Sequence, residues 1–181
     1  MQITEQNLEV LLKNRFDLDA FREGQLEAIC TLMEKNRLLC IQPTGHGKSL
    51  LYQMPAVLLD GMTLVISPLL ALMRDQISQL TSRFNIPAAS INSDQSEYEN
   101  NVARIAARAG KIKILFVAPE QLEDIDRFDF LLALPINWLS RNLRGSLTLL
   151  KTSIIWYFAK VVKTWYFMVF IGDKKPCAVS I

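Results

Sequence analysis

The sequence predicts an α/β fold, in which a mostly parallel sheet is flanked by helices. Short apolar runs alternate with longer segments whose apolar residues recur at helical spacing. The segments between successive runs are long enough for crossover helices, which parallel strands need because each must return to the same edge of the sheet. Half of the 181 residues are apolar and 21% are charged, as in ordinary globular proteins.

The N-terminal region is expected to hold two helices and then a buried strand. The first helix follows Thr4, a residue type that caps helix N-termini, and its apolar residues have amphipathic spacing: Leu8, Leu11 and Leu12. The second helix is expected over residues 22–35. The apolar run at 38–42 reads as a buried strand, and Pro43 ends it.

Helices and strands then alternate through the middle of the chain. The expected helices cover residues 48–59, 69–83 and 95–109. The expected strands cover residues 63–67, 88–91 and 113–118. No internal repeat or low-complexity linker interrupts this order, so residues 1–137 are expected to belong to one domain.

Residues 138–181 differ in kind from the rest of the chain. Residues 1–137 hold 13 Lys and Arg against 17 Asp and Glu, a net charge of −4, whereas the tail holds 7 against 1, a net charge of +6. The tail also contains all three tryptophans and shows neither a helical nor a strand period. It is therefore expected to be an irregular segment outside the domain.

The most apolar part of the tail is 154–171. A spanning helix needs roughly 20 mostly uncharged residues, and Lys160 and Lys163 would each cost about 3 kcal/mol near the bilayer centre. A buried segment is therefore favoured over a membrane span. Membrane association through 154–171 stays open as an alternative.

The cysteines and the N-terminus bear on location. Cys30, Cys40 and Cys177 are odd in number and lack CxxC spacing, so they indicate neither a disulfide framework nor a zinc site. Residues 1–16 lack the basic and then apolar pattern of a secretory signal. A reducing, cytoplasmic location is expected.

The strongest motif runs from Gln42 to Ser49, between an expected strand and an expected helix. Such a loop points backbone N–H groups at phosphate oxygens, and the helix N-terminus adds partial positive charge. Gly45 and Gly47 let the backbone come close to the phosphates, Lys48 would reach the β- and γ-phosphates, and the Ser49 hydroxyl would bind Mg²⁺. The residues expected to hold ATP and Mg²⁺ here are Pro43, Thr44, Gly45, His46, Gly47, Lys48 and Ser49.

This motif departs from the GxxxxGK[ST] pattern of P-loops only at its first position, Gln42. The alternative, a Gly-rich turn that begins an ordinary helix, is the weaker reading. His46 is the only histidine, so the chain cannot build a metal site from imidazoles, and it reads as an exposed loop residue. The acidic run 123–126 reads as the first turn of a helix.

Four blocks in order extend this motif to a family resemblance. Phe-Arg-Glu-Gly-Gln at 21–25, then the segments 45–56, 64–76 and 115–122, resemble successive motifs of RecQ-type ATP-dependent DNA helicases of superfamily 2. The resemblance implies a RecA-like P-loop lobe, incomplete in this chain, that binds ATP, Mg²⁺ and single-stranded DNA.

The resemblance also implies roles for residues outside the loop. Gln25 would pair with the adenine edge, and Arg22 would pack near the base. Contacts to single-stranded DNA would come from two blocks: Ser67, Pro68 and Leu69, and Pro119 and Glu120. Exposed N–H groups at the strand end near Ser67 would suit a DNA phosphate. The alternatives are surface polarity at a helix start for the first pair and tight turns for the two blocks.

The resemblance ends near residue 137, before the carboxylates that drive hydrolysis. A RecQ helicase would continue with a buried strand and Asp-Glu-Ala-His, but this position reads Trp138 to Leu147, and no acid lies between Asp129 and Asp173. We therefore expect a helicase fragment that binds ATP but neither hydrolyses it nor unwinds DNA alone. A non-catalytic nucleotide- or DNA-binding module stays open. A frameshift or gene rearrangement after codon 137 is our hypothesis for the tail.

Overall fold

The computed structural model describes residues 4–35, 37–42, 45–122, 130–131, 134, 159–161 and 164–170. Its α-helices are α1 (Glu5–Phe16), α2 (Gln25–Lys35), α3 (Leu50–Leu58), α4 (Leu70–Ser78) and α5 (Glu97–Arg108). A π-helical turn, η1 (Gln79–Arg83), follows α4, and a 3-10 turn, η2 (Pro119–Leu122), follows β4. The strands are β1 (Arg37–Gln42), β2 (Thr63–Ile66), β3 (Ala88–Ile91), β4 (Ile114–Val117), β5 (Ala159–Val161) and β6 (Thr164–Phe170).

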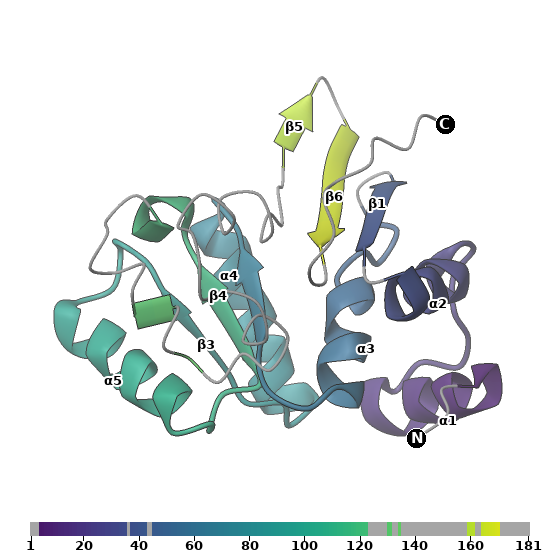
Figure 1. Ribbon diagram of the computed structural model, residues 1–181, viewed down its shortest axis with the longest axis horizontal. Coiled ribbons are helices and arrows are strands. Elements are labelled where there is room, and N and C mark those ends of the chain that lie inside the picture. The colour runs from purple at the N-terminus through teal and green to yellow at the C-terminus, as the bar shows by residue number, and fades with distance from the viewer. Residues whose placement is uncertain are drawn as a thin grey trace.

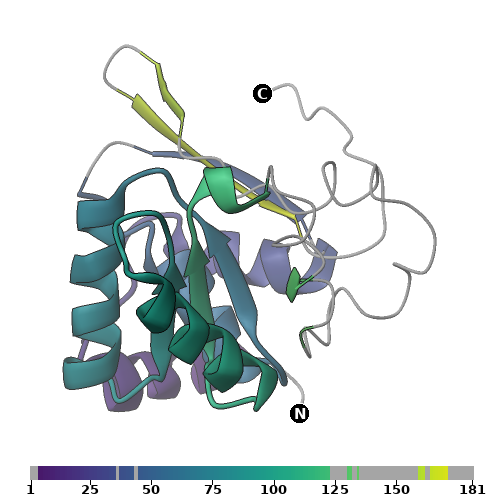
Figure 2. The ribbon, with the colours of Figure 1, turned by 90° about the vertical axis from the view of Figure 1, so that its left-hand side faces the viewer.

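A parallel sheet with the order β2-β4-β3 forms one half of the molecule (Figures 1 and 2). Both outer strands run parallel to β4, so that Val65 and Ser90 both lie opposite Phe116. The chain passes through α4 and η1 between β2 and β3, and through α5 between β3 and β4. The prediction of an α/β fold with a parallel, helix-flanked sheet is confirmed.

Strand β1 belongs to a second sheet, with the order β1-β6-β5, in which both pairings are antiparallel. Cys40 lies opposite Phe167, and Gln42 lies opposite Trp165. The sequence predicts an irregular tail, and these strands are a departure from that prediction. An aromatic and β-branched segment suits a strand, and pairing covers the open edge of β1. Nothing else of the tail, including Trp138 to Leu147 and Asp173, is described.

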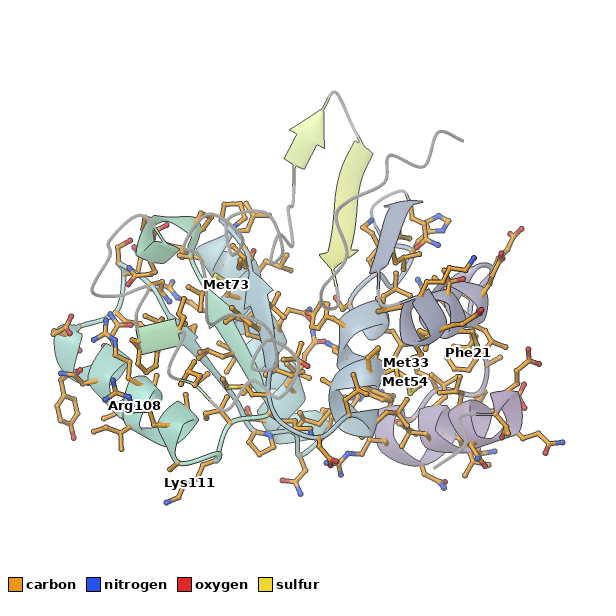
Figure 3. All side chains as sticks on the ribbon, in the orientation of Figure 1. Phe21, Met33, Met54, Met73, Arg108 and Lys111 are labelled. Atoms are coloured by element: carbon orange, nitrogen blue, oxygen red, sulfur yellow. The ribbon has the colours of Figure 1, made fainter. Side chains whose placement is uncertain are left out.

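Helices α1, α2 and α3 pack together in the other half of the molecule, where β1 also lies (Figure 1). Leu8, Leu12 and Phe16 on α1 are almost fully buried, and each such side chain contributes about 1.5–3 kcal/mol through removal from water. Met33 and Met54 are part of the same packed region (Figure 3). This packed region supports the start of α2, where Gln25 lies.

Both faces of the parallel sheet are packed with apolar side chains, and one of these faces shares its cluster with α1, α2 and α3. Leu115, Phe116 and Val117 on β4 are each at most 1% exposed. Such a continuous apolar strand is typical of a parallel sheet covered on both faces. Tyr52 on α3 packs edge-on against Phe116, with ring centroids 6.1 Å apart. This contact ties the helix after the loop to the sheet.

Some helix boundaries agree with the predicted ones and others differ by a few residues. The Thr4 hydroxyl accepts from the Asn7 N–H at 3.3 Å, which confirms the expected cap. The helix expected over 22–35 begins only at Gln25, because residues 23–24 form a turn. The helix expected over 69–83 ends as an α-helix at Ser78, and residues 79–83 widen into η1. The acidic run 123–126 lies outside the described residues.

In the part of the chain that the structure describes, no helix combines the length and hydropathy of a membrane span. Parts of the 154–171 segment are described as strands, at 159–161 and 164–170.

Candidate functional site

The loop between β1 and α3 turns sharply through two glycines. β1 ends at Gln42 and α3 begins at Leu50. Gly45 has φ +88° and Gly47 has φ +74°, a left-handed region that glycine enters without the steric penalty of a side chain. Pro43 and Thr44 lie outside the described residues, so the described part of the loop runs from Gly45 to Ser49. His46 is exposed, as the sequence predicts.

Gln25 holds this loop from the first turn of α2. Its Nε2 donates to the carbonyl oxygens of His46 at 3.2 Å and Gly47 at 3.0 Å. Its Oε1 accepts from the Arg22 N–H at 2.8 Å, and the side chain is only 3% exposed. The Arg22 guanidinium donates to the Gly45 carbonyl. The pair that the resemblance assigns to the adenine base therefore engages the loop carbonyls in this structure.

The fit around Gly47 is close. A Cβ at this position would lie 2.5 Å from the Gln25 Nε2, in addition to the unfavourable φ. At Gly45 a Cβ would meet nothing within 4 Å. The motif therefore needs its second glycine for both space and conformation, whereas the first meets a conformational need alone.

Lys48 folds back toward the end of the strand. Its Nζ donates to the Gln42 carbonyl oxygen at 2.8 Å. Burial lowers the pKa of the Lys48 ammonium, and the nearby Cys40 partly offsets this shift. Ser49 is the N-cap residue of α3, but its side chain makes no capping hydrogen bond. Both side chains predicted to meet phosphate and Mg²⁺ thus lie at the start of α3.

A cavity of about 320 Å³ lies beside the loop. Its walls come from the loop, α3, α4 and the ends of β2 and β4: Gly45, Gly47, Lys48, Ser49, Tyr52, Ser67, Leu69, Leu72, Met73, Gln76 and Phe116. The structure therefore brings the predicted phosphate loop together with Ser67 and Leu69 of the predicted DNA block.

A buried polar network stands at one wall of this cavity. The Tyr52 hydroxyl donates to the Gln76 Oε1 at 2.8 Å, and the Gln53 Nε2 donates to the same oxygen at 2.9 Å. Burial raises the pKa of Tyr52, so its hydroxyl stays protonated and donating. Sequence reasoning missed this network, although amides inside apolar helical stretches such as Leu50–Leu58 could have signalled buried hydrogen bonds.

The expectation of exposed N–H groups near Ser67 is wrong. The Ser67 N–H donates to the Val117 carbonyl at 3.1 Å, and the Leu69 N–H donates to the Ser67 hydroxyl at 3.2 Å. Pro68 has no N–H to offer, and Ser67 is only 2% exposed. The turn uses these donors itself, because a strand end at a sheet edge must satisfy its backbone internally when buried.

The second predicted DNA block lies on η2. Pro119 is half-buried and Glu120 is exposed. The Glu120 carboxylate accepts from the Ser93 hydroxyl at 3.1 Å. Since β2 and β4 are parallel, Ser67 and Pro119 follow strands that end at the same edge of the sheet.

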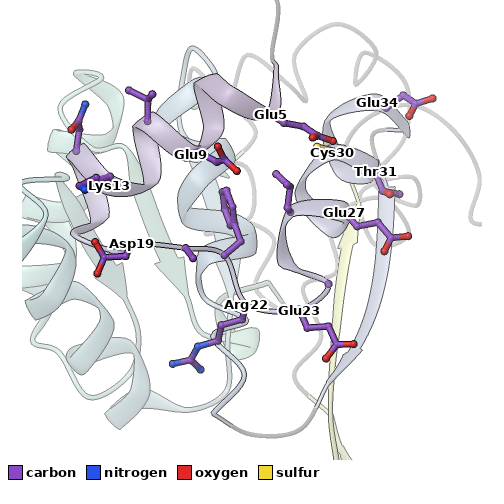
Figure 4. Close-up of a pocket in the computed structure, with 16 residues that line it drawn as sticks. Glu5, Glu9, Lys13, Asp19, Arg22, Glu23, Glu27, Cys30, Thr31 and Glu34 are labelled. Carbon is purple, nitrogen blue, oxygen red and sulfur yellow. The ribbon is translucent and has the colours of Figure 1, made fainter.

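A groove of about 940 Å³ runs between α1 and α2 and reaches Phe21 and Arg22 (Figure 4). Acidic side chains predominate along it: Glu5, Glu9, Asp19, Glu23, Glu27 and Glu34, against Lys13 and Arg22. This charge repels polyphosphate but tolerates a neutral ring. Among the described residues, no cluster of His, Cys, Asp and Glu could hold a metal ion.

Comparison with known proteins decides the family. The DEAD/DEAH box helicase model matches residues 22–142. The chain belongs to the DEAD/DEAH box helicase family. The matched region begins at Arg22 and includes both the loop and the cavity beside it.

Relatives of this helicase segment are of RecQ type, which confirms the resemblance. It is 40% identical to the ATP-dependent DNA helicase Q-like 5 of Arabidopsis thaliana over 69% of this chain and 14% of that protein. It is 43% identical to the ATP-dependent DNA helicase RecQ of Bacillus subtilis over 64% of this chain, and 41% identical to that of Haemophilus influenzae over 62%. The matches span 20% and 18% of those two proteins, so the chain covers a fifth or less of each relative.

Proposed function

We propose that this chain binds Mg·ATP as the nucleotide-binding element of a RecQ-type ATP-dependent DNA helicase, and that the chain alone does not hydrolyse the nucleotide. The observation that carries the proposal is the way the loop is held. Its carbonyl groups at Gly45, His46 and Gly47 engage Arg22 and Gln25 on one side.

The opposite side of the loop is then left with N–H groups. Within the described residues, the backbone N–H groups of Gly45, Gly47 and Ser49 have no hydrogen-bond acceptor. A concave row of such groups at a helix N-terminus attracts anions through its partial positive charge. A β-phosphate in this position would accept hydrogen bonds from these backbone N–H groups.

Lys48 and Ser49 would complete the phosphate site. The Lys48 ammonium would exchange the Gln42 carbonyl for β- and γ-phosphate oxygens, and these negatively charged partners would stabilise its positive charge. The Ser49 hydroxyl would supply one Mg²⁺ ligand, since Mg²⁺ takes its other ligands from phosphate oxygens and water in such sites.

The base would lie on the side of Phe21 and Arg22. The acidic groove there disfavours the triphosphate, so the charges orient the nucleotide with its phosphates toward Lys48. For Gln25 to pair with the adenine edge it would have to release the carbonyls of His46 or Gly47. We therefore propose that the main role of Gln25 is to hold the loop, and that contact with the adenine base is secondary.

Single-stranded DNA binding is the weaker part of the proposal. Pro68, Leu69 and Pro119 present a turn at the edge of the sheet, but the N–H groups of Ser67 and Leu69 are already used. The exposed Glu120 carboxylate also repels a phosphate backbone. We propose weak binding that depends on salt.

A single-turnover assay with excess protein over labelled ATP tests the absence of hydrolysis. The sequence contains no Asp-Glu-Ala-His, and water attack needs such carboxylates. We expect bound ATP and no phosphate release above the protein-free rate, with or without single-stranded DNA. Phosphate release that single-stranded DNA stimulates would overturn this part of the proposal.

A further inference from the structure

Helix α5 carries a second apolar face that nothing described covers. Its inner face packs on the sheet through Asn100, Ala103 and Ala107, which are at most 7% exposed. Its outer face carries three large apolar side chains at spacings of four and three residues: Tyr98, 78% exposed, Val102, 49% exposed, and Ile105, 67% exposed. This spacing places them in one stripe along the helix, and α5 itself lies at the left-hand edge of the view in Figure 1.

Charges of opposite sign lie at the two ends of one flank of this stripe. Glu97 begins the helix, and Arg108 ends it. Glu97 and Arg104 form an ion pair at 2.6 Å, which shows that they share this flank. Arg108 lies one turn farther on, with its guanidinium 5.1 Å from the Phe130 ring centroid and the residue still exposed. Figure 3 shows Arg108 on α5 with Lys111 beyond it.

We propose that this stripe is the contact between two copies of the chain, related by a two-fold axis near Val102. In an antiparallel pair of α5 helices, Tyr98 of one copy faces Ile105 of the other, and Val102 faces its own equivalent. The same arrangement sets Glu97 against Arg108 of the second copy at both ends, because a two-fold axis repeats every contact.

The charges beside the stripe favour an antiparallel orientation of the two α5 helices and a second copy of the chain as the partner. In a parallel pair the two-fold axis would run along the helices and set the two charged flanks on opposite sides of the contact, so neither Glu97 nor Arg108 would meet a charge of opposite sign. The antiparallel pair matches each charge with its opposite, and the surface is therefore complementary to itself. A second copy satisfies both the apolar stripe and its charged flank.

The contact is small. Three side chains and one helix face bury less than the roughly 1,200–2,000 Å² of a stable interface, so the dimer is weak, with a dissociation constant no tighter than about 1 μM. Glu97 and Arg108 lie on the rim, where they set orientation more than affinity.

Sedimentation velocity over a hundredfold range of concentration tests the contact. The wild-type chain is expected to shift from monomer to dimer, and Val102→Glu is expected to stay monomeric. Val10→Glu is the matched control, because Val10 on α1 is also exposed, at 60%. Equal dimerisation of wild type and Val102→Glu, or a wild type that stays monomeric throughout, would overturn the proposal.

Disulfide trapping tests the orientation. Val102→Cys lies at the axis and is expected to cross-link to itself under mild oxidation beyond the wild-type background. Tyr98→Cys lies about four residues from the axis, so its two copies would be about 12 Å apart and should not cross-link. A thermal melt checks that each variant is folded. Efficient self-cross-linking of Tyr98→Cys together with failure of Val102→Cys would contradict the antiparallel arrangement.

Discussion

The side-chain amide of Gln25 donates to the carbonyl oxygen of Gly47 at 3.0 Å. This bond joins two residues 22 positions apart and fixes the direction in which the loop carbonyls point. Because a peptide carbonyl and the next N–H point in opposite directions, holding the carbonyls on Gln25 turns the N–H groups toward the other side. The buried amide thereby prepares the loop for an anion.

Replacement of the donor at Gln25 should loosen the loop. Gln25→Glu keeps an acceptor for the Arg22 N–H but loses the donated bonds to His46 and Gly47. We expect the free energy of unfolding to fall by about 1–3 kcal/mol and ATP to bind about tenfold more weakly, since binding must then order the loop. Urea denaturation and ATP titration measure the two effects. Unchanged ATP affinity in a folded variant would show that Gln25 does not prepare the loop.

Gly47→Ala should be more harmful than the same change at Gly110. Both glycines have positive φ, at +74° and +67°, so both variants incur a backbone strain of about 1–2 kcal/mol. Only at Gly47 would the new Cβ collide with the Gln25 Nε2. We expect the larger loss of thermal stability and the loss of ATP affinity in Gly47→Ala alone. Equal losses in the two variants would mean that the contact with Gln25 is unimportant.

Gln42→Met should stabilise the protein. Within the described part of the chain, the Oε1 of Gln42 is buried without a hydrogen-bond partner. Methionine has a similar length and removes the unsatisfied acceptor, so we expect a gain of about 1 kcal/mol in the free energy of unfolding. Chemical denaturation measures it. A clear loss of stability would indicate that the Gln42 amide makes a contact worth more than the unsatisfied oxygen costs.

The capping box of α5 predicts a pH effect. Hydrogen bonds from the Ser96 hydroxyl and backbone lower the pKa of Glu99 below its ordinary value of 4.5. A carboxyl whose pKa is lower in the folded than in the unfolded state stabilises the folded protein at pH values above the unfolded-state pKa. This contribution is lost as the pH falls through the folded-state pKa. NMR titration should show the Glu99 pKa rising toward 4.5 in Ser96→Ala. A pKa unchanged by this substitution would rule out the Ser96 hydroxyl as its main cause.

Local sequence patterns predicted the local structure well. The apolar run that becomes β4 and the Thr4 cap are visible in a few residues, because periodicity and capping act over one or two turns. The loop at Gly45 and Gly47 is equally visible, since its glycines serve a conformation that few other residues adopt.

The sequence patterns could not predict contacts between residues that are far apart in the chain. The two carbonyls that accept from the Gln25 Nε2 lie 21 and 22 positions away, so nothing near Gln25 indicates that its amide is used by the loop. The pairing of β6 with β1 joins segments more than 120 residues apart, and an unbroken aromatic run shows no strand period. The Ser67 N–H appeared exposed in sequence because the strand residue that accepts from it, Val117, comes 50 residues later in the chain.

The most direct test of the account is calorimetric titration of the folded chain with Mg·ATP, in wild type and Lys48→Ala. Removing the ammonium should weaken binding by about tenfold to a hundredfold, since a charged hydrogen bond contributes about 1.5–3 kcal/mol. A thermal melt confirms that both proteins are folded. We predict that the wild type binds Mg·ATP and that Lys48→Ala binds it much more weakly. A folded wild type that binds no Mg·ATP, or two folded proteins that bind it equally tightly, would contradict the account.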